Sequence, residues 1–542
     1  MAPPRFKAPK KNQAAVKLVD EDDYLTQGDS HEEAMRKHRV GDPAKALRFA
    51  DRALEVYAQG LAKFPHSFDL AYNKARLELE KATDEEYSEV IPGPIIMILR
   101  QALESHQLAR NLDPLHADTL FNMAQVLTSM AEIHAEDDET DDTEALQNIQ
   151  QALETQSQCF DLQLQNYTKN RQELEQAMRE TAANQSHFNT PDKARGSTIE
   201  TQTSDQEEQW VSIEEPVTAS TLLDTIIAQI EALTLLCSIL NSSFSSGPGT
   251  SQGLASPASM AWIESYSAKL LTQTLPTLFN ENRDTLESRL PEVALPRAVF
   301  TSSYLELSLR MSMVTVEKYK QELDAAFAQP GVEATSADTL MASARALMSF
   351  NSALADRATT LANVNPEEAN AALRWKILLE AQSRLASVAS LKDIDKNVVA
   401  ATHLLRGDVS LLLQTLAYPP AAHTQARTTT SQLLSHAEVY YRNAGKLFGS
   451  LGSSAKEEKL TSALREGIVT ILKQLTAAQS SAGSSTGQDN SGTLVGLQAS
   501  REQIGEALQP LLKVKSEQWA RDQIEEMVTA GLIREEILSV VL

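Results

Sequence analysis

The feature that most constrains the fold of this chain is a short sequence that occurs twice. Residues 65–75 read PHSFDLAYNKA, and residues 114–124 read PLHADTLFNMA. Each copy begins with proline, and equivalent later places hold an aspartate, an aromatic residue, an asparagine and an alanine. Proline ends one helix, and the aromatic and alanine side chains let the next helix pack closely against it. The repetition predicts an all-α fold that is built from successive pairs of helices.

The residues around the second copy extend this pattern. Ala102 and Ala109 lie on one face of a helix, and Pro114 follows shortly after them. Residues 41–47 have the composition of a tight turn followed by the start of a second helix. Together these segments resemble the tetratricopeptide repeat, in which each unit is a pair of antiparallel helices. The resemblance is clearest over residues 40–134 and implies a helical solenoid with a concave surface that holds other proteins.

The spacing of the two copies departs from the pattern of this family. They are 49 residues apart, whereas tetratricopeptide units recur about every 34 residues. A loop rich in acidic residues, proline and glycine over residues 83–94 accounts for part of the excess. Pro65 also lies further along the chain than the spacing of this family would place it. Two extra helical turns over residues 54–63 would account for the difference. We therefore expect stretched repeats, with long flexible inserts elsewhere in the solenoid.

Changes in composition divide the chain into helical and polar segments. The segments expected are a disordered tail (1–28), an N-terminal helical region (29–182) with an acidic loop (135–144), a disordered insert (183–217), a helix (218–240), a flexible loop (241–258), a C-terminal helical solenoid region (259–479), a second flexible loop (480–496) and C-terminal helices (497–542). The basic start of the tail fits either a solvated chain end or a nuclear-import signal.

Three local expectations follow from the helical segments. Apolar residues from Leu146 to Met178 recur at spacings of three, four and seven, which predicts one helix of about 35 residues. That helix fits either a packed solenoid helix or an extended arm that resembles a coiled coil. One continuous helix is expected over residues 295–326. The sequence around Gly407 and Asp408, within a helix expected over residues 396–416, is similar to the turn that begins at Gly41, which suggests that degenerate repeats continue there.

Charge and composition narrow the kinds of partner. The formal net charge of the 542 residues is −24, which disfavours direct nucleic-acid binding and favours a basic protein as partner. The alternative is that the acidity only maintains solubility. Apolar windows are interrupted by charged residues, which predicts no membrane span. The N-terminus lacks the apolar core of a secretory signal, and two cysteines fit a reducing compartment. A cytoplasmic or nuclear location is therefore expected.

The sequence lacks several short motifs that are typical of nucleotide-binding, metal-binding and catalytic sites. It contains no phosphate-binding loop, no dinucleotide fingerprint, no HExxH and no CxxC. The ten histidines are scattered, and Cys159 has no local base, so it is expected to be a buried or incidental thiol. The sequence therefore predicts a protein that is not an enzyme and that uses no cofactor or metal.

The resemblance to tetratricopeptide repeats directs attention to the opening helix of each unit. It implies that Asn73 and Asn122 occupy the polar position that often bonds the backbone of a bound peptide, and an amide offers both donor and acceptor. The alternative is that these side chains cap or bridge neighbouring helices. A clamp for a terminal carboxylate is not expected, because Lys74 and Arg76 are not matched in the next unit. The acidic loop adds further candidate partner-binding residues: Asp137, Asp138, Glu139, Asp141 and Asp142.

These observations favour a non-enzymatic protein-binding scaffold or adaptor. Its partner would be a protein, with a basic client such as a ribosomal protein or histone as one example. A structural subunit of a larger complex is the alternative, and an enzyme with an unfamiliar helical site is a third class.

Overall fold

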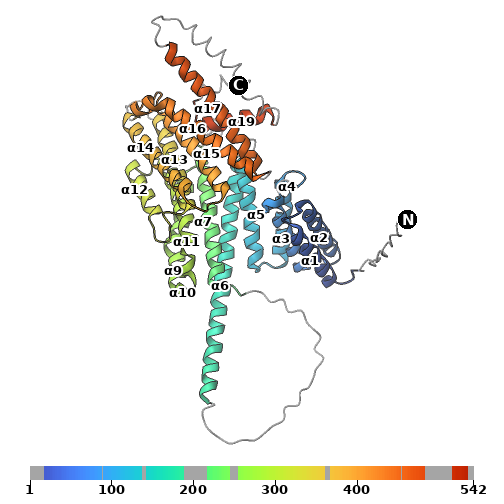
Figure 1. Ribbon diagram of the computed structural model, residues 1–542. Helices are drawn as coiled ribbons and strands as arrows, with labels where there is room; N and C mark the ends of the chain where they lie inside the picture. The colour runs from blue at the N-terminus through green and yellow to red at the C-terminus, as the bar shows by residue number, and fades with distance from the viewer. Residues whose placement is uncertain are drawn as a thin grey trace, which may run out of the picture. The chain divides into compact units, whose positions relative to one another are not determined.

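The structure is a computed structural model and is all-helical (Figure 1). It describes residues 18–87, 90–136, 142–187, 216–244, 254–360, 367–452, 455–482 and 515–534. Within these ranges no strand occurs, which confirms the all-α class. The chain divides into two units, residues 1–232 and 233–542, and the division falls within α7 (Ala219–Ser242).

Consecutive helices of the first unit pack against one another, as Figure 1 shows from blue to green. Some helices also touch the helix after next: α1 touches α3, and α3 touches α5. These elements are α1 (Glu21–His38), α2 (Pro43–Lys63), α3 (Phe68–Thr83), the short 3-10 helix η1 (Glu85–Tyr87), α4 (Ile95–Leu112), α5 (Ala117–Glu136) and α6 (Asp142–His187).

The start of α1 corrects the expected extent of the N-terminal tail. Residues 21–28 were expected to be disordered, yet they form the first turns of α1. Asp20 caps this helix by accepting a hydrogen bond from the backbone N–H of Asp23, and the Asp23 carboxylate accepts one from the backbone of Asp20. Such a reciprocal capping box satisfies free donors at the helix start, and the acidic first turn suits the helix dipole. An acidic cluster that seemed typical of disorder is therefore a helix start.

The stretched spacing of the first unit has the expected origin. Helix α2 continues to Lys63 before Phe64 ends it, which provides the extra turns. Residues 84–94 then connect α3 to α4, and the described part of this segment includes the short η1 and the left-handed Gly93. Ser67 begins α3 by accepting a hydrogen bond from the N–H of Leu70.

Small residues form the contact surfaces between these helices. Ala102 and Ala109 of α4 are fully buried, as predicted. Ala102 packs in a cluster with Leu79 of α3 and Val126 of α5, so α4 touches both neighbours at this point. Alanine allows such close approach because its side chain is a single methyl group.

Replacing Ala109 with leucine is expected to destabilise the first unit by about 1–3 kcal/mol, because the larger side chain overpacks a filled contact. Thermal unfolding of this variant, compared with wild type, measures the effect. Ala58 of α2 is exposed, so Ala58→Leu is the matched control and should change the melting temperature little. Equal melting temperatures for Ala109→Leu and wild type would contradict the predicted packing.

Helix α6 combines the two arrangements that the sequence left open. It is 46 residues long, and its first part packs against α5 with Ile149, Ala152 and Leu153 fully buried. Every residue from 171 to 181 is exposed, including Leu174 and Met178. The helix is thus packed at its start and exposed further along.

The second unit contains the C-terminal part of α7 and the remaining helices. Helix α11 packs against both α12 and α13, and from α13 to α17 each described helix packs against the next. One large apolar core extends from α11 to α19. The elements are α8 (Pro257–Ala268), the π-helix η2 (Lys269–Thr274), α9 (Leu275–Glu281), α10 (Arg283–Leu286), η3 (Glu287–Arg289), α11 (Leu290–Arg310), α12 (Val316–Phe327), α13 (Ala337–Thr360), α14 (Glu367–Ser390), α15 (Lys396–Thr415), α16 (Thr424–Leu451), α17 (Lys456–Ala482) and α19 (Glu517–Thr529).

One local expectation for this unit is wrong. The single helix expected over residues 295–326 is interrupted between α11 and α12, where Ser312 has a positive φ of 59° and Thr315 caps α12. Gly407 and Asp408 lie inside α15, which matches the helix expected over residues 396–416. Packing requires glycine at position 407, because a β-carbon there would overlap the ring of Tyr441.

The predicted inserts lie mostly outside the described residues, in segments 188–215, 245–253 and 483–514. Helix α6 continues to His187, so residues 183–187 are helical rather than part of the insert. Helix α7 ends at Ser242 and α8 begins at Pro257, so the ends of the expected loop 241–258 are also helical.

Helix α7 is long and apolar enough to cross a membrane by length and composition alone. Its most apolar window has a mean hydropathy of 1.7, despite Asp224 and Glu231, and 61% of that window is buried inside the protein. Burial of this kind is typical of a core helix, which passes the same hydropathy test.

Candidate functional site

Helices α3 and α5 hold Asn73 and Asn122 in equivalent places. Each asparagine is the sixth residue of its helix, counted from Phe68 in α3 and Ala117 in α5. Both starts are capped by side chains, because Ser67 accepts from the N–H of Leu70 and His116 accepts from the N–H of Thr119. Both asparagines are half-buried, so the repeated sequence produces repeated local structure.

The two amides differ in their contacts. The side chain of Asn122 hydrogen bonds the hydroxyl of Tyr72, which links α5 to α3. Burial is the main cause that raises the pKa of Tyr72, and the nearby Asp118 adds to it. Among the described residues, Asn73 has no hydrogen-bond partner for its side chain. Asn122 therefore bridges neighbouring helices, while Asn73 keeps its donors and acceptor for another group.

An aromatic cluster at the starts of these two helices extends the same region. The ring of His116 lies 4.6 Å from that of Phe68 and 4.9 Å from that of Tyr72, measured between centroids. Phe68 and Tyr72 are themselves 5.7 Å apart. The aromatic residue of the repeated phrase could be recognised in the sequence. The contact of His116 with Phe68 and Tyr72 could not, because it depends on α3 and α5 lying together.

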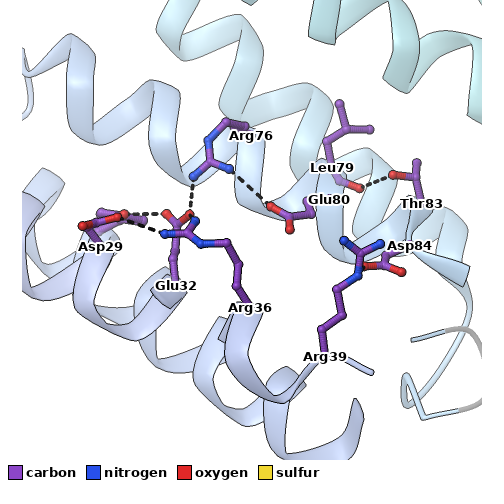
Figure 2. Close-up of polar contacts among 10 residues, drawn as sticks. Asp29, Glu32, Arg36, Arg39, Arg76, Leu79, Glu80, Thr83 and Asp84 are labelled. Atoms are coloured by element: carbon purple, nitrogen blue, oxygen red, sulfur yellow. Dashed lines mark hydrogen bonds and ion pairs between the residues drawn. The ribbon is translucent and has the colours of Figure 1, made fainter. Parts of the chain in front are cut away.

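Charged residues join α1 to α3 (Figure 2). Glu32 of α1 is 1% exposed and accepts a hydrogen bond of 2.6 Å from the hydroxyl of Tyr57 of α2. Figure 2 shows Arg76 of α3 between Glu32 and Glu80, and Arg76 forms ion pairs with both carboxylates. Arg36 approaches the same Glu32 carboxylate at 3.4 Å. A buried carboxylate is tolerated only with such partners, so this network fixes the opening helices together.

The network also engages the two cations that a carboxylate clamp would need. Arg76 is engaged by Glu32 and Glu80. The ammonium group of Lys74 donates to Glu78 and to Ser105 of α4, each at 2.7 Å. Both cations that a terminal carboxylate would need already stabilise contacts between helices.

The junction at Tyr57 has a defined geometry. A β-carbon on Gly28 of α1 would overlap the Tyr57 ring, so glycine lets this ring lie against the helix. Burial, and next the hydrogen bond to Glu32, raise the pKa of Tyr57 above its usual value. The phenol therefore remains protonated and donates to the carboxylate.

The same combination of side chains recurs in the second unit. Gly407 of α15 makes room for the ring of Tyr441 of α16, whose hydroxyl donates to Asp408 at 2.8 Å. Arg465 of α17 donates to the same Asp408 oxygen at 2.7 Å and to Glu526 at 3.2 Å. In each unit, then, one helix supplies glycine and acid, the next supplies tyrosine, and the third supplies arginine. We call this set of four residues the glycine–tyrosine junction.

Among the described residues, no three His, Cys, Asp or Glu side chains lie together as metal ligands. Cys159 is buried, as predicted, and burial raises its pKa to about 12, which keeps the thiol protonated. Burial also lowers the pKa of His106 to about 4, so this imidazole is neutral near pH 7.

The structure describes only one of the acidic residues that were predicted to bind a partner. Asp142 is the first residue of α6, whereas Asp137, Asp138, Glu139 and Asp141 lie outside the described residues.

Comparison with known proteins gives one limited similarity. No family model matches the chain. Over 122 residues it is 38% identical to a protein of Schizosaccharomyces pombe described as UPF0656 protein C926.02. The matched segment is 22% of this chain and 26% of that protein, so the similarity spans about a quarter of the relative's length.

Proposed function

We propose that this chain is a non-enzymatic protein-binding scaffold or adaptor, folded as a tetratricopeptide-like solenoid, and that its client is a basic protein. The observation that carries the proposal is the equivalence of α3 and α5. Each begins at a capped start and carries a half-buried asparagine at its sixth position. Because α1 touches α3 and α3 touches α5, the opening helices form one surface along which an extended peptide can lie.

The recurrence of the glycine–tyrosine junction supports a solenoid that continues into the second unit. Its members lie on three successive helices in both places, α1 to α3 and α15 to α17. Repeat proteins reuse one contact between neighbouring helices in this way. The second-unit copy has aspartate directly after glycine, whereas in the first unit three residues lie between Gly28 and Glu32, so the repeats have diverged.

Charge supports a basic client. The net charge of −24 produces a field that attracts basic proteins and speeds their association at low ionic strength. Acidic residues are concentrated in the sequence between α5 and α6.

The alternative function is a structural subunit of a larger complex. It is favoured by the exposed part of α6, where Leu164, Leu174 and Met178 follow helical spacing and are 41–61% exposed. An apolar stripe on an exposed helix suits a fixed neighbouring helix.

Affinity purification of the full chain with mass spectrometry, at low and high salt, tests the proposal. A scaffold for a basic client should recover basic proteins whose yield falls as salt rises, because ionic strength screens the attraction. A fixed set of partners that resists high salt would favour the structural subunit. Recovery of acidic clients would contradict the electrostatic part.

Replacing Asn73 and Asn122 with alanine is expected to raise the dissociation rate of a recovered client, by an amount equivalent to about 1 kcal/mol for each lost hydrogen bond. Surface plasmon resonance measures this rate. Tyr72→Phe is the matched control, because it removes the bond between Tyr72 and Asn122 but keeps the amide. If Tyr72→Phe weakened binding as much as Asn122→Ala, the amide would act only as a helix bridge.

A further inference from the structure

Helix α6 carries an apolar stripe on the part that continues beyond α5 (Figure 1). The side chains of Leu164, Leu174 and Met178 are exposed, as is every residue from 171 to 181. Helices in proteins gain most of their stability by packing an apolar face against another element. Within the described part of the chain, no element covers these three side chains. We call residues 164–181 the α6 arm.

The stripe on the α6 arm has the repeat of a coiled coil. Alternating steps of three and four residues separate Leu164, Tyr167, Arg171, Leu174, Met178 and Thr181. The first, third and fifth of these are the a positions of a heptad, and the others are the d positions. The arm is about 27 Å long, which is two and a half heptads. A repeat of this kind fits one further helix that lies along the arm.

The charges of the α6 arm are balanced, unlike those of the whole chain. The arm has three basic and three acidic residues, whereas the net charge of the chain is −24. Its ion pairs lie within the helix, from Lys169 to Glu173 at 4.0 Å, and from Arg171 and Arg179 to Glu175 at 3.6 and 3.9 Å. Two copies of so acidic a chain repel each other in general. The arm is a surface on which they can meet without that repulsion.

Arg171 determines the direction in which a second copy of the arm can lie. In a parallel pair the a positions face each other, so two Arg171 guanidinium groups would meet in the apolar seam. In an antiparallel pair centred between residues 172 and 173, Arg171 lies opposite Leu174 of the second copy and beside its Glu175. The stem of the arginine can then lie along the leucine while the guanidinium pairs with the carboxylate. The antiparallel arrangement is therefore the complementary one.

We propose that the α6 arm binds the same arm of a second copy of this chain, as an antiparallel two-stranded coiled coil. In this register Tyr167 of each copy faces Met178 of the other, and Leu164 faces Thr181. Both copies contribute the same surface, as a two-fold symmetric dimer requires. The inference goes beyond the proposed function and does not rest on it. A second copy on the arm also removes the observation that favoured a structural subunit.

Sedimentation equilibrium of the full chain across the micromolar range tests the dimer, because a seam this short should give a weak contact. Wild type should change from monomer to dimer. Leu174→Lys places an ammonium group beside Arg171 of the second copy, so it should raise the dissociation constant about 10-fold or more. Gln176 is exposed and lies outside the stripe, so Gln176→Lys adds the same charge and should leave that constant unchanged. A monomer at every concentration, or equal effects of the two variants, overturns the proposal.

Disulfide trapping tests the antiparallel direction. Cys159 and Cys237 are buried, so they should not react. Full chains with Leu164→Cys and with Thr181→Cys, carrying tags of different mass, are mixed and oxidised. They should form a mixed disulfide, because the two positions lie opposite each other. Leu164→Cys alone should not cross-link, since its two thiols would be about 25 Å apart. A cross-linked Leu164→Cys dimer without the mixed product overturns the antiparallel arrangement.

Salt separates the dimer from the binding of a basic client. Ionic strength screens the repulsion between two acidic chains, so the dimer should persist or tighten as salt rises. The client should instead be released. A dimer that dissociates at high salt contradicts an apolar seam and overturns the proposal. A monomeric chain that still recovers a basic client overturns the arm contact and leaves the scaffold intact. A dimer that depends on Leu174 in a chain that recovers no client supports the arm contact and contradicts the scaffold.

Discussion

Replacing Arg465 with methionine is expected to destabilise the second unit by about 3–5 kcal/mol, because it leaves the buried Asp408 carboxylate without its cation. Asp408 is 5% exposed and Arg465 is 7% exposed. Only the hydroxyl of Tyr441, which donates at 2.8 Å, would remain on the carboxylate oxygen that Arg465 contacts. A single neutral donor compensates a buried charge poorly.

Hydrogen exchange with mass spectrometry measures this effect locally, as lost protection in α15, α16 and α17. Arg442 is the matched control: its side chain is 43% exposed and pairs with Glu438 and Glu466. Arg442→Met should cost about 1 kcal/mol or less, since solvent screens exposed pairs. The double variant Arg465→Met, Asp408→Asn should recover part of the loss, because it removes the stranded charge. Equal protection in Arg465→Met and wild type would show that Asp408 is not held as a buried charge.

Replacing Tyr57 with alanine is expected to destabilise the first unit by about 3–5 kcal/mol, the range for deleting a large buried aromatic side chain. Tyr57 is 1% exposed, and it also donates to the buried Glu32. Tyr57→Phe should cost less, because the ring stays and only the hydrogen bond is lost. Hydrogen exchange in α1, α2 and α3 measures both changes.

A double-mutant cycle with Gly28 tests the close contact itself. Gly28→Ala should destabilise wild type, because a β-carbon there overlaps the Tyr57 ring. In the Tyr57→Ala background the ring is gone, so Gly28→Ala should be neutral or stabilising, since alanine favours a helix interior over glycine. Additive effects would contradict the contact, because residues that touch show coupling.

Much of the fold could be predicted from the sequence because helix signals are local. The repeated proline-to-alanine phrase located α3 and α5, and the alanines of α4 were correctly assigned to a buried contact. Predictions failed where one local signal had two structural meanings. The acids near Asp20 cap a helix rather than mark disorder.

The candidate sites were less accessible to sequence reasoning. Asn73 and Asn122 could be proposed because they belong to a repeated phrase. Glu32 and Asp408 could not, since each is one of many acids in an acidic chain, and only the packing of the helices brings Arg76 and Arg465 to them.

The sequence by itself determined that this protein is helical, where α3 and α5 begin and which small residues lie between the first helices. Periodicity, caps and turn residues act within a few positions of one another, so they can be recognised along the chain. Only the tertiary structure decided which charges are paired. Glu32 and Arg76 are 44 residues apart, and Asp408 and Arg465 are 57 apart. Burial and charge compensation depend on distances in space, and no local pattern of residues determines those distances.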